Sequence, residues 1–221
     1  MLKFSQNLFS GVMGAAPCWV LVVLFVMTWQ TPMAVDEGRW VKLGVGIMLL
    51  EFILVHSGGF FAAFSQKKDK AGRPIRLSHR VGFMLGLLCF YTIFAVCFSL
   101  EFNSWTLFWI FCWVTVSRFL AMFFDAEDGA HIMMQRSGVS ALLYISSAFL
   151  SIFIRLPRAG LTEEVLNKIY PGRGGGEWER DPQQALLAGM VYFGFLGLWE
   201  LLAPFLAHRK NLQNQTQEDT R

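Results

Sequence analysis

The sequence predicts an all-α protein, a polytopic helical bundle with about six transmembrane helices. Two observations lead to this prediction. Of 221 residues, 54% are hydrophobic and only 16% are charged, an apolar excess that a water-soluble domain of this size could not bury. The apolar residues also fall in long runs, and a helix needs roughly 20 residues to cross about 30 Å of hydrocarbon. The chain, residues 1–221, is therefore expected to be a single transmembrane domain.

Six apolar runs are candidates for spans. The fifth is short and rich in serine, so it is expected to pack against protein more than lipid, because small side chains allow helices to approach closely. In chain order the predicted spans cover residues 9–29, 41–64, 81–100, 105–124, 138–154 and 185–207.

The distribution of basic residues predicts the orientation. Cytoplasmic loops carry an excess of Lys and Arg, and the loop between the second and third predicted spans is strongly basic. With six spans, both termini and the polar tail 208–221 are then cytoplasmic, and the loop 155–184 is extracytoplasmic. A bacterial inner membrane is the expected location. The six basic residues of the cytoplasmic loop are Lys67, Lys68, Lys70, Arg73, Arg76 and Arg80.

The extracytoplasmic loop contains the pattern of a short helix followed by a linker. Thr162 is a good N-cap, and Glu163 and Glu164 suit the positive end of a helix. The glycine-rich stretch 172–176 is expected to be a flexible linker, because no strand precedes it and no helix with a suitable lysine follows, as a phosphate-binding loop would require. The predicted helix is interfacial, since its apolar residues Leu161, Val165, Leu166 and Ile169 fall on one side.

Four ionisable residues lie inside predicted spans: Glu51, His56, Arg118 and Glu200. At 1.5 Å per residue, His56, Arg118 and Glu200 are about 9 to 12 Å from the inner ends of their helices, and Glu51 is about 20 Å in. An isolated charge in hydrocarbon costs at least about 2.5 to 3.5 kcal/mol, so each should face protein or water. We expect these four residues to form an ion or proton site open to the cytoplasm.

Neighbouring residues support an inward orientation. In the last predicted span Gly189, Gly197, Glu200 and Pro204 share one face, and Pro204 leaves the carbonyl of Glu200 without its helical donor. In the second span, small residues at 57–59 and 62–63 surround the polar positions, which predicts that this helix lies at the centre of the bundle.

Three functions are compatible with this pattern. Buried ionisable groups mark ion paths, which favours a small proton- or cation-handling transporter or channel. The alternative is a structural or assembly subunit, in which the buried charges only fix helix register. An intramembrane metal enzyme acting on lipid, with Glu51, Glu200 and His56 as ligands, is less favoured because Arg118 would repel the metal. The sequence favours a protein that is not an enzyme.

A second set of polar residues lies between the fourth and fifth spans. Asp125, Glu127, Asp128 and His131 have the donor types of a metal site, but their spacing matches no established metal loop, so a solvated connector is favoured.

The sequence specifies no cofactor. The expected partners are the lipid bilayer and either further copies of the chain or a larger membrane complex. Nucleic acid is not expected, because the net charge is only +3 and the basic residues lie in loops.

Overall fold

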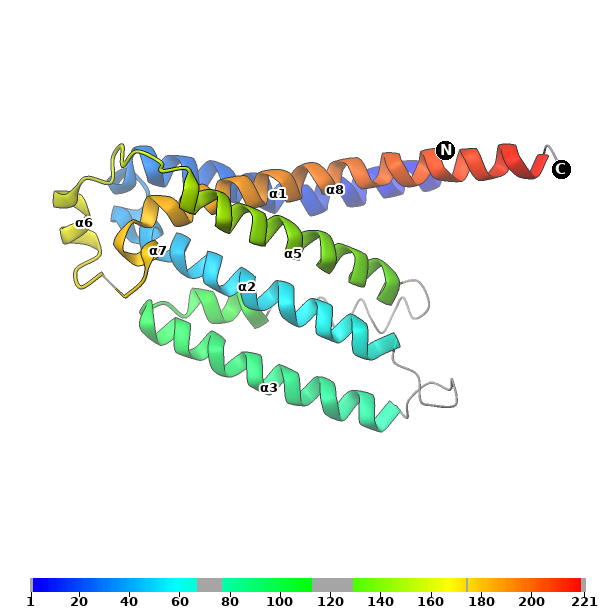
Figure 1. Cartoon of the computed structure of the whole chain (residues 1–221), viewed down its shortest axis with the longest axis horizontal. Helices are drawn as coiled ribbons and strands as arrows, with labels where there is room; N and C mark the ends of the chain where they lie inside the picture. Colours follow the sequence, from blue (N-terminus) through cyan, green and yellow to red (C-terminus); the bar gives the residue numbers. More distant parts are fainter. Residues whose placement is uncertain (1, 67–76, 113–128, 174, 220–221) are drawn as a thin grey trace.

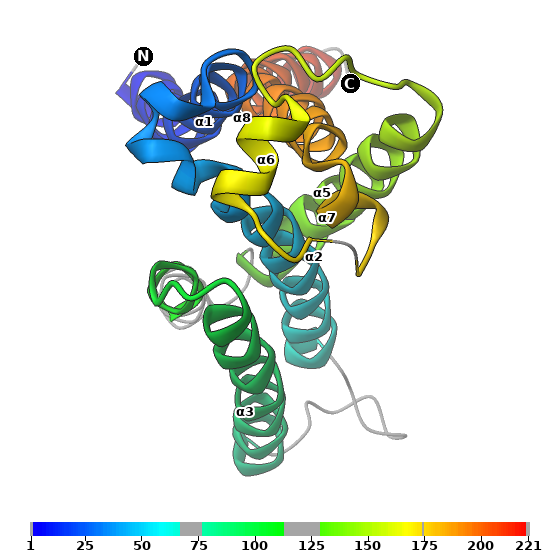
Figure 2. The same ribbon diagram turned by 90° about the vertical axis from the view of Figure 1, so that its left-hand side faces the viewer.

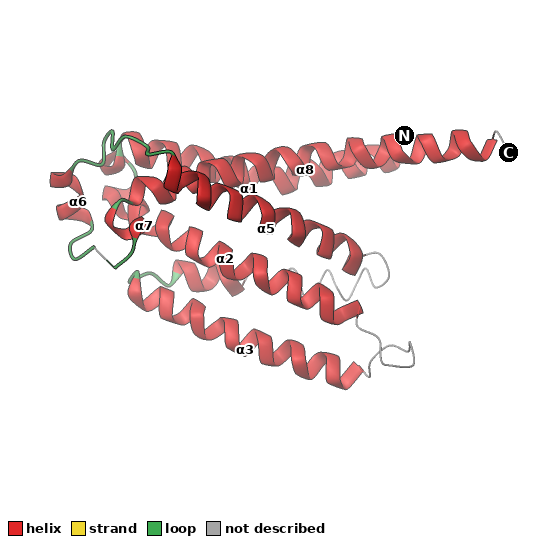
Figure 3. Cartoon of the chain, in the orientation of Figure 1, coloured by secondary structure: helices red, strands yellow, loops and turns green. Residues whose placement is uncertain are grey.

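A computed structural model describes residues 2–66, 77–112, 129–173 and 175–219, and helices with short connections make up all of this part of the chain (Figure 3). Residues 106–112 are also helical, immediately before a stretch that is not described. The elements are α1 (Leu2–Gln30), η1 (Pro32–Ala34), η2 (Asp36–Gly38), α2 (Arg39–Gln66), α3 (Leu77–Glu101), α5 (Gly129–Phe153), α6 (Glu163–Ile169), α7 (Glu177–Arg180) and α8 (Pro182–Asp219).

The five long helices run roughly side by side, with α2 in the middle (Figures 1 and 2). α1 and α8 form the most extensive helix pair, α5 packs against both α8 and α2, and α3 contacts α2. The short elements η1, η2, α6 and α7 gather at the end of the long helices that lies away from the chain termini (Figure 1). Because of this position we call residues 31–38, 155–173 and 175–181 the outer cap. The two chain termini lie toward the opposite end.

Three helices in the described part of the chain are long and apolar enough to cross a membrane: Asp36–Ser57, Val81–Glu101 and Pro182–Leu202. They correspond to the second, third and sixth predicted spans. Two further predicted spans coincide with shorter apolar segments, Ala15–Gln30 and Ser137–Phe153. The fourth, 105–124, lies largely outside the described residues. The helical class is therefore confirmed, while the described residues contain three candidate spans where six spans were predicted.

The central position of α2 follows from its glycines. A Cβ atom on Gly44 would lie 2.7 Å from Leu186 of α8, and one on Gly46 would lie 2.8 Å from Leu107. Leu186 and Leu107 thus pack directly on the α2 backbone, where a residue larger than glycine would leave them no room. On α8, a Cβ on Gly189 would lie 2.0 Å from the ring of Phe25. Phe25 belongs to α1 and is fully buried. The close approach of α1, α2 and α8 therefore depends on glycine.

The outer cap is tied to the long helices by specific hydrogen bonds. The indole Nε1 of Trp29, at the end of α1, donates to the carbonyl of Pro157 (2.7 Å), and the amide of Gly160 donates to the carbonyl of Trp29 (3.1 Å). With its side-chain amide turned to match its neighbours, Gln184 donates to the carbonyls of Ser151 and Ile154. The end of α5 is thereby fastened to the start of α8.

The predicted short helix is present as α6, and Thr162 caps it by accepting a hydrogen bond from the amide of Val165 (3.4 Å). Its apolar side does not face outward, however. Leu161 and Leu166 are fully buried in the protein core. Amphipathicity predicted the helix correctly but could not tell whether protein or lipid would cover its apolar side.

Ion pairs hold the outer cap together where the sequence predicted a flexible linker. Arg158 pairs with Asp181 (2.8 Å) and with Glu163, while Arg173 pairs with Glu163 and donates to Asn167 (2.8 Å). The side chain of Arg173 is only 11% exposed. The linker from α6 to α7 is therefore anchored at Arg173 by two side chains of α6.

These pairs shift the pKa values of their members. Hydrogen bonds from Arg158 lower the pKa of Glu163. Burial raises the pKa of Asp181, but hydrogen bonds from Arg158 and Gln183 outweigh it and leave that pKa below its usual value. Both carboxyl groups are therefore stabilised as carboxylates in the folded protein.

Candidate functional site

The buried carboxylate of α2 has a hydrogen-bond donor on α8. The hydroxyl of Tyr192 donates to Oε1 of Glu51 at 2.7 Å, across 141 positions of sequence. Tyr192 is fully buried and Glu51 is half-buried. A low-dielectric environment strengthens such a hydrogen bond, because water does not compete for its donor and acceptor. The bond therefore links α2 to α8 at the level of the carboxylate.

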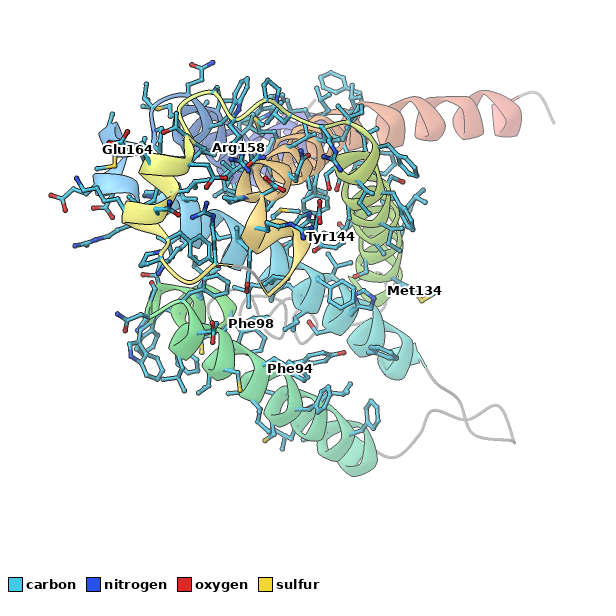
Figure 4. The ribbon with its side chains drawn as sticks, turned by 60° about the vertical axis from the view of Figure 1, so that its left-hand side comes forward. Phe94, Phe98, Met134, Tyr144, Arg158 and Glu164 are labelled. Atoms are coloured by element: carbon cyan, nitrogen blue, oxygen red, sulfur yellow. The ribbon has the colours of Figure 1, made fainter. Side chains whose placement is uncertain are left out.

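A second tyrosine joins α5 to the same place. The hydroxyl of Tyr144 donates to the carbonyl of Met48 at 2.9 Å, about one helical turn from Glu51 on α2. The rings of Tyr144 and Tyr192 meet edge to face, with centroids 5.6 Å apart. Figure 4 labels Tyr144 on α5 beside the central helices. Glu51, Tyr144 and Tyr192 thus form one contact, here called the tyrosine junction, at which three helices meet.

His56 is held within its own helix. Its Nδ1 lies 2.7 Å from the carbonyl oxygen of Phe52, and its ring lies 4.1 Å from that of Phe52, centroid to centroid. A carbonyl oxygen only accepts, so Nδ1 must carry the proton and Nε2 is the nitrogen left for another partner. His56 is half-buried. It lies just over one turn from Glu51 along α2, on the cytoplasmic side in the predicted orientation.

Glu200 lies on α8, eight positions beyond Tyr192 and therefore about 12 Å further along the helix axis. It is half-buried. Gly197, nearly one turn before it, approaches Trp19 and Cys18 of α1, as expected for a face directed toward α1. The structure brings Glu51 together with two tyrosines, whereas Glu200 lies closer to the terminal end of the α1 and α8 pair.

The remaining predicted site residues cannot be compared with the structure. Arg118, Asp125, Glu127 and Asp128 lie outside the described residues, and of His131 only the backbone, in α5, is described. Within the described part of the chain, no group of three or more His, Cys, Asp and Glu side chains is placed to hold a metal ion. The predicted metal set belongs to the stretch outside it.

Sequence reasoning missed the two tyrosines. The chain has only four tyrosines, and three of them, Tyr91, Tyr144 and Tyr192, lie inside predicted spans. Tyrosine in membrane helices is enriched at the interfaces, where its hydroxyl reaches water. A tyrosine near mid-span needs an internal acceptor instead, and this signal could have pointed to Glu51.

Comparison of the whole chain with protein-family models, with curated proteins and with solved structures found no match. The fold and the junction therefore define the class of protein. It is an all-helical chain in which three described helices are able to cross a membrane, with a carboxylate held by tyrosine where α2, α5 and α8 meet.

Proposed function

We propose that the protein is a small proton- or cation-handling membrane protein and that Glu51 is its central ionisable group. The observation that carries the proposal is the hydrogen bond from the fully buried Tyr192 to Glu51, on a helix long and apolar enough to be a span. Carboxylates inside membrane helices are costly, and they commonly serve proton or ion transfer. The hydrogen bond from Tyr192 fixes the position of the Glu51 carboxyl group.

The proposal assigns distinct roles to the other predicted residues. His56 and Glu200, both half-buried, are proposed to connect Glu51 with the end of the molecule at which the chain termini lie. Arg118 is proposed to balance their charge. We place the termini in the cytoplasm and the outer cap outside, because the basic residues of 67–80 favour the cytoplasmic side. A bacterial inner membrane fits this orientation.

Flux measurements on the protein reconstituted in liposomes test the proposal. Glu51→Gln keeps the shape of the side chain and its ability to accept from Tyr192, so the variant should fold and lose pH-dependent flux. Glu101→Gln is the matched control, because Glu101 is an exposed carboxylate at the end of α3, and it should keep the flux. If folded wild-type protein moves no proton or cation under any gradient, the transport proposal is wrong.

A structural or assembly subunit is the second candidate, and the surface of α3 favours it. Of the most apolar stretch of Val81–Glu101, only 12% is buried by the rest of the protein, whereas the corresponding share in Asp36–Ser57 is 61%. A photo-crosslinker at Ile93, which is 61% exposed, should capture a protein other than this chain if this candidate is right, and only lipid or a second copy of this chain if the transport proposal is right. A crosslinker at the buried Leu50 is the control for internal contacts.

A further inference from the structure

A groove of about 750 Å³ opens at the outer cap, away from the tyrosine junction. It lies where two candidate spans reach the same end of the molecule, since Asp36–Ser57 begins there and Val81–Glu101 ends there. The volume is within the range of pockets that hold small ligands. In a membrane, this level corresponds to the lipid headgroups.

The groove is built by close contacts between distant segments. A Cβ on Gly38 would lie 2.7 Å from Ile169, so the η2 backbone rests directly against α6. The ammonium of Lys42 lies 5.0 Å from the centroid of the Tyr170 ring, which fixes α2 against the end of α6. Burial, with the nearby carboxylates of Glu179 and Glu101, raises the pKa of Tyr170 to about 12, so the phenol beside the groove stays neutral.

The lining carries both signs of charge together with apolar side chains. Lys42 and Lys168 supply ammonium groups, and no described carboxylate lies within ion-pair distance of either. Arg39 and Asp36 face each other at 3.9 Å, both largely exposed, so this pair is weak and solvated. Glu37 adds a carboxylate. The apolar lining residues are Met33, Leu43, Phe102 and Ile169.

Backbone strain is concentrated at the same place. Four described residues other than glycine have a positive φ, and three of them line the groove: Asp36 (48°), Glu37 (54°) and Asn103 (47°). Such conformations are sparsely populated and are retained where the surroundings enforce them, often at ligand sites. Of these three residues, Glu37 is the one that adopts a positive φ least readily, because Asp and Asn tolerate this region better.

We propose that the groove binds a phosphoethanolamine group, the headgroup of an amine-bearing phospholipid, with its phosphate at Lys42 and Lys168 and its ammonium at Glu37. A purely anionic headgroup would leave Glu37 facing negative charge. The apolar lining residues and the position at the end of two candidate spans suit a ligand that continues into acyl chains. This site is independent of the proposed function of Glu51.

Native mass spectrometry of the delipidated full chain tests the proposal with phosphatidylethanolamine, phosphatidylglycerol and soluble phosphoethanolamine as probes. Wild-type protein should retain phosphatidylethanolamine in preference to phosphatidylglycerol. Lys168→Gln, at an exposed position, should weaken its retention about tenfold, as expected for loss of one charge-assisted contact. Glu37→Gln should abolish the preference between the two lipids.

Arg155→Gln is the matched control, because Arg155 is an exposed cation of the outer cap outside this groove, and it should leave retention unchanged. Soluble phosphoethanolamine should compete weakly if the acyl chains contribute, whereas full competition would identify a soluble phosphoamine as the ligand and overturn the lipid assignment. Equal retention of the two lipids by wild type would overturn the headgroup assignment. Equal losses in Lys168→Gln and Arg155→Gln would overturn the site itself.

Discussion

α2 and α3 are neighbouring helices of similar apolar character, yet their surroundings are opposite. Protein buries 61% of the most apolar stretch of α2 but only 12% of the most apolar stretch of α3. Leu186 and Leu107 pack directly against Gly44 and Gly46 of α2. A Cβ on Gly82 or Gly86 of α3, in contrast, would meet nothing within 4 Å. Figure 4 shows Phe94 and Phe98 on α3, and Phe94 is among its exposed apolar side chains.

The comparison separates two properties that hydropathy combines. A high apolar content indicates that a helix leaves water, but it does not indicate what covers the helix. Polar groups within the run and glycines in contact with bulky neighbours mark the helix that protein covers. α2 has both features, whereas the described part of the chain leaves most of the apolar surface of α3 uncovered.

The largest expected difference between the two helices is the cost of removing side-chain volume. Leu50→Ala on α2, at 1% exposure, should destabilise the protein by about 3 kcal/mol, because it leaves a cavity in packed surroundings. Ile93→Ala on α3, at 61% exposure, should cost less than about 0.5 kcal/mol. Reversible unfolding in mixed micelles measures both values. Similar losses would mean that α3 is covered in the isolated protein.

Adding volume should produce the next largest effect. Gly189→Ala would place a Cβ 2.0 Å from Phe25 and 3.1 Å from the sulfur of Met48, so about 2 kcal/mol should be lost through overpacking. Gly86→Ala meets no neighbour and should be neutral or raise stability by up to about 1 kcal/mol. The same unfolding assay applies. A stable Gly189→Ala protein would contradict the close approach of α1 and α8.

Loss of a hydrogen bond at the tyrosine junction should cost as much as this or less, depending on the acceptor. Tyr192→Phe removes a donor from the carboxylate of Glu51 and should cost about 2 kcal/mol. Tyr144→Phe removes a donor from the carbonyl of Met48 and should cost about 1 kcal/mol. If Glu51→Gln is the background, the two losses should become similar. Unchanged losses in that background would indicate that the carboxylate is not the acceptor.

The smallest expected effect belongs to the outer cap and depends on pH. Asp181 and Glu163 have lowered pKa values in the folded protein, so their pairs with Arg158 stabilise it above the usual carboxyl pKa of about 4. This stability is lost as the pH falls through the lower, folded-state values. Arg158→Gln should therefore reduce stability slightly at pH 7 and flatten its decline in acid. An acid profile identical to that of wild type would exclude the pairs as its cause.

Sequence reasoning predicted the helical class, the central place of α2 and the Thr162 cap, because each depends on local pattern. It could not predict the anchoring of Arg173, since this side chain meets α6 only after the loop has folded back. The junction could not be predicted either, because Tyr144 and Tyr192 bond to α2 residues that are 96 and 141 positions away in the sequence. Contacts of this range depend on helix rotation, which periodicity leaves open in a helix that is apolar on all sides.

Infrared difference spectroscopy on the reconstituted protein tests the role of Glu51 most directly. Acidification or addition of a transported cation should perturb a carboxyl band together with a tyrosine ring band, because Tyr192 donates to the group that responds. Glu51→Gln should lose both bands, and Tyr192→Phe should lose the ring band and shift the carboxyl band. A Glu51→Gln spectrum identical to that of wild type under both conditions would contradict the account.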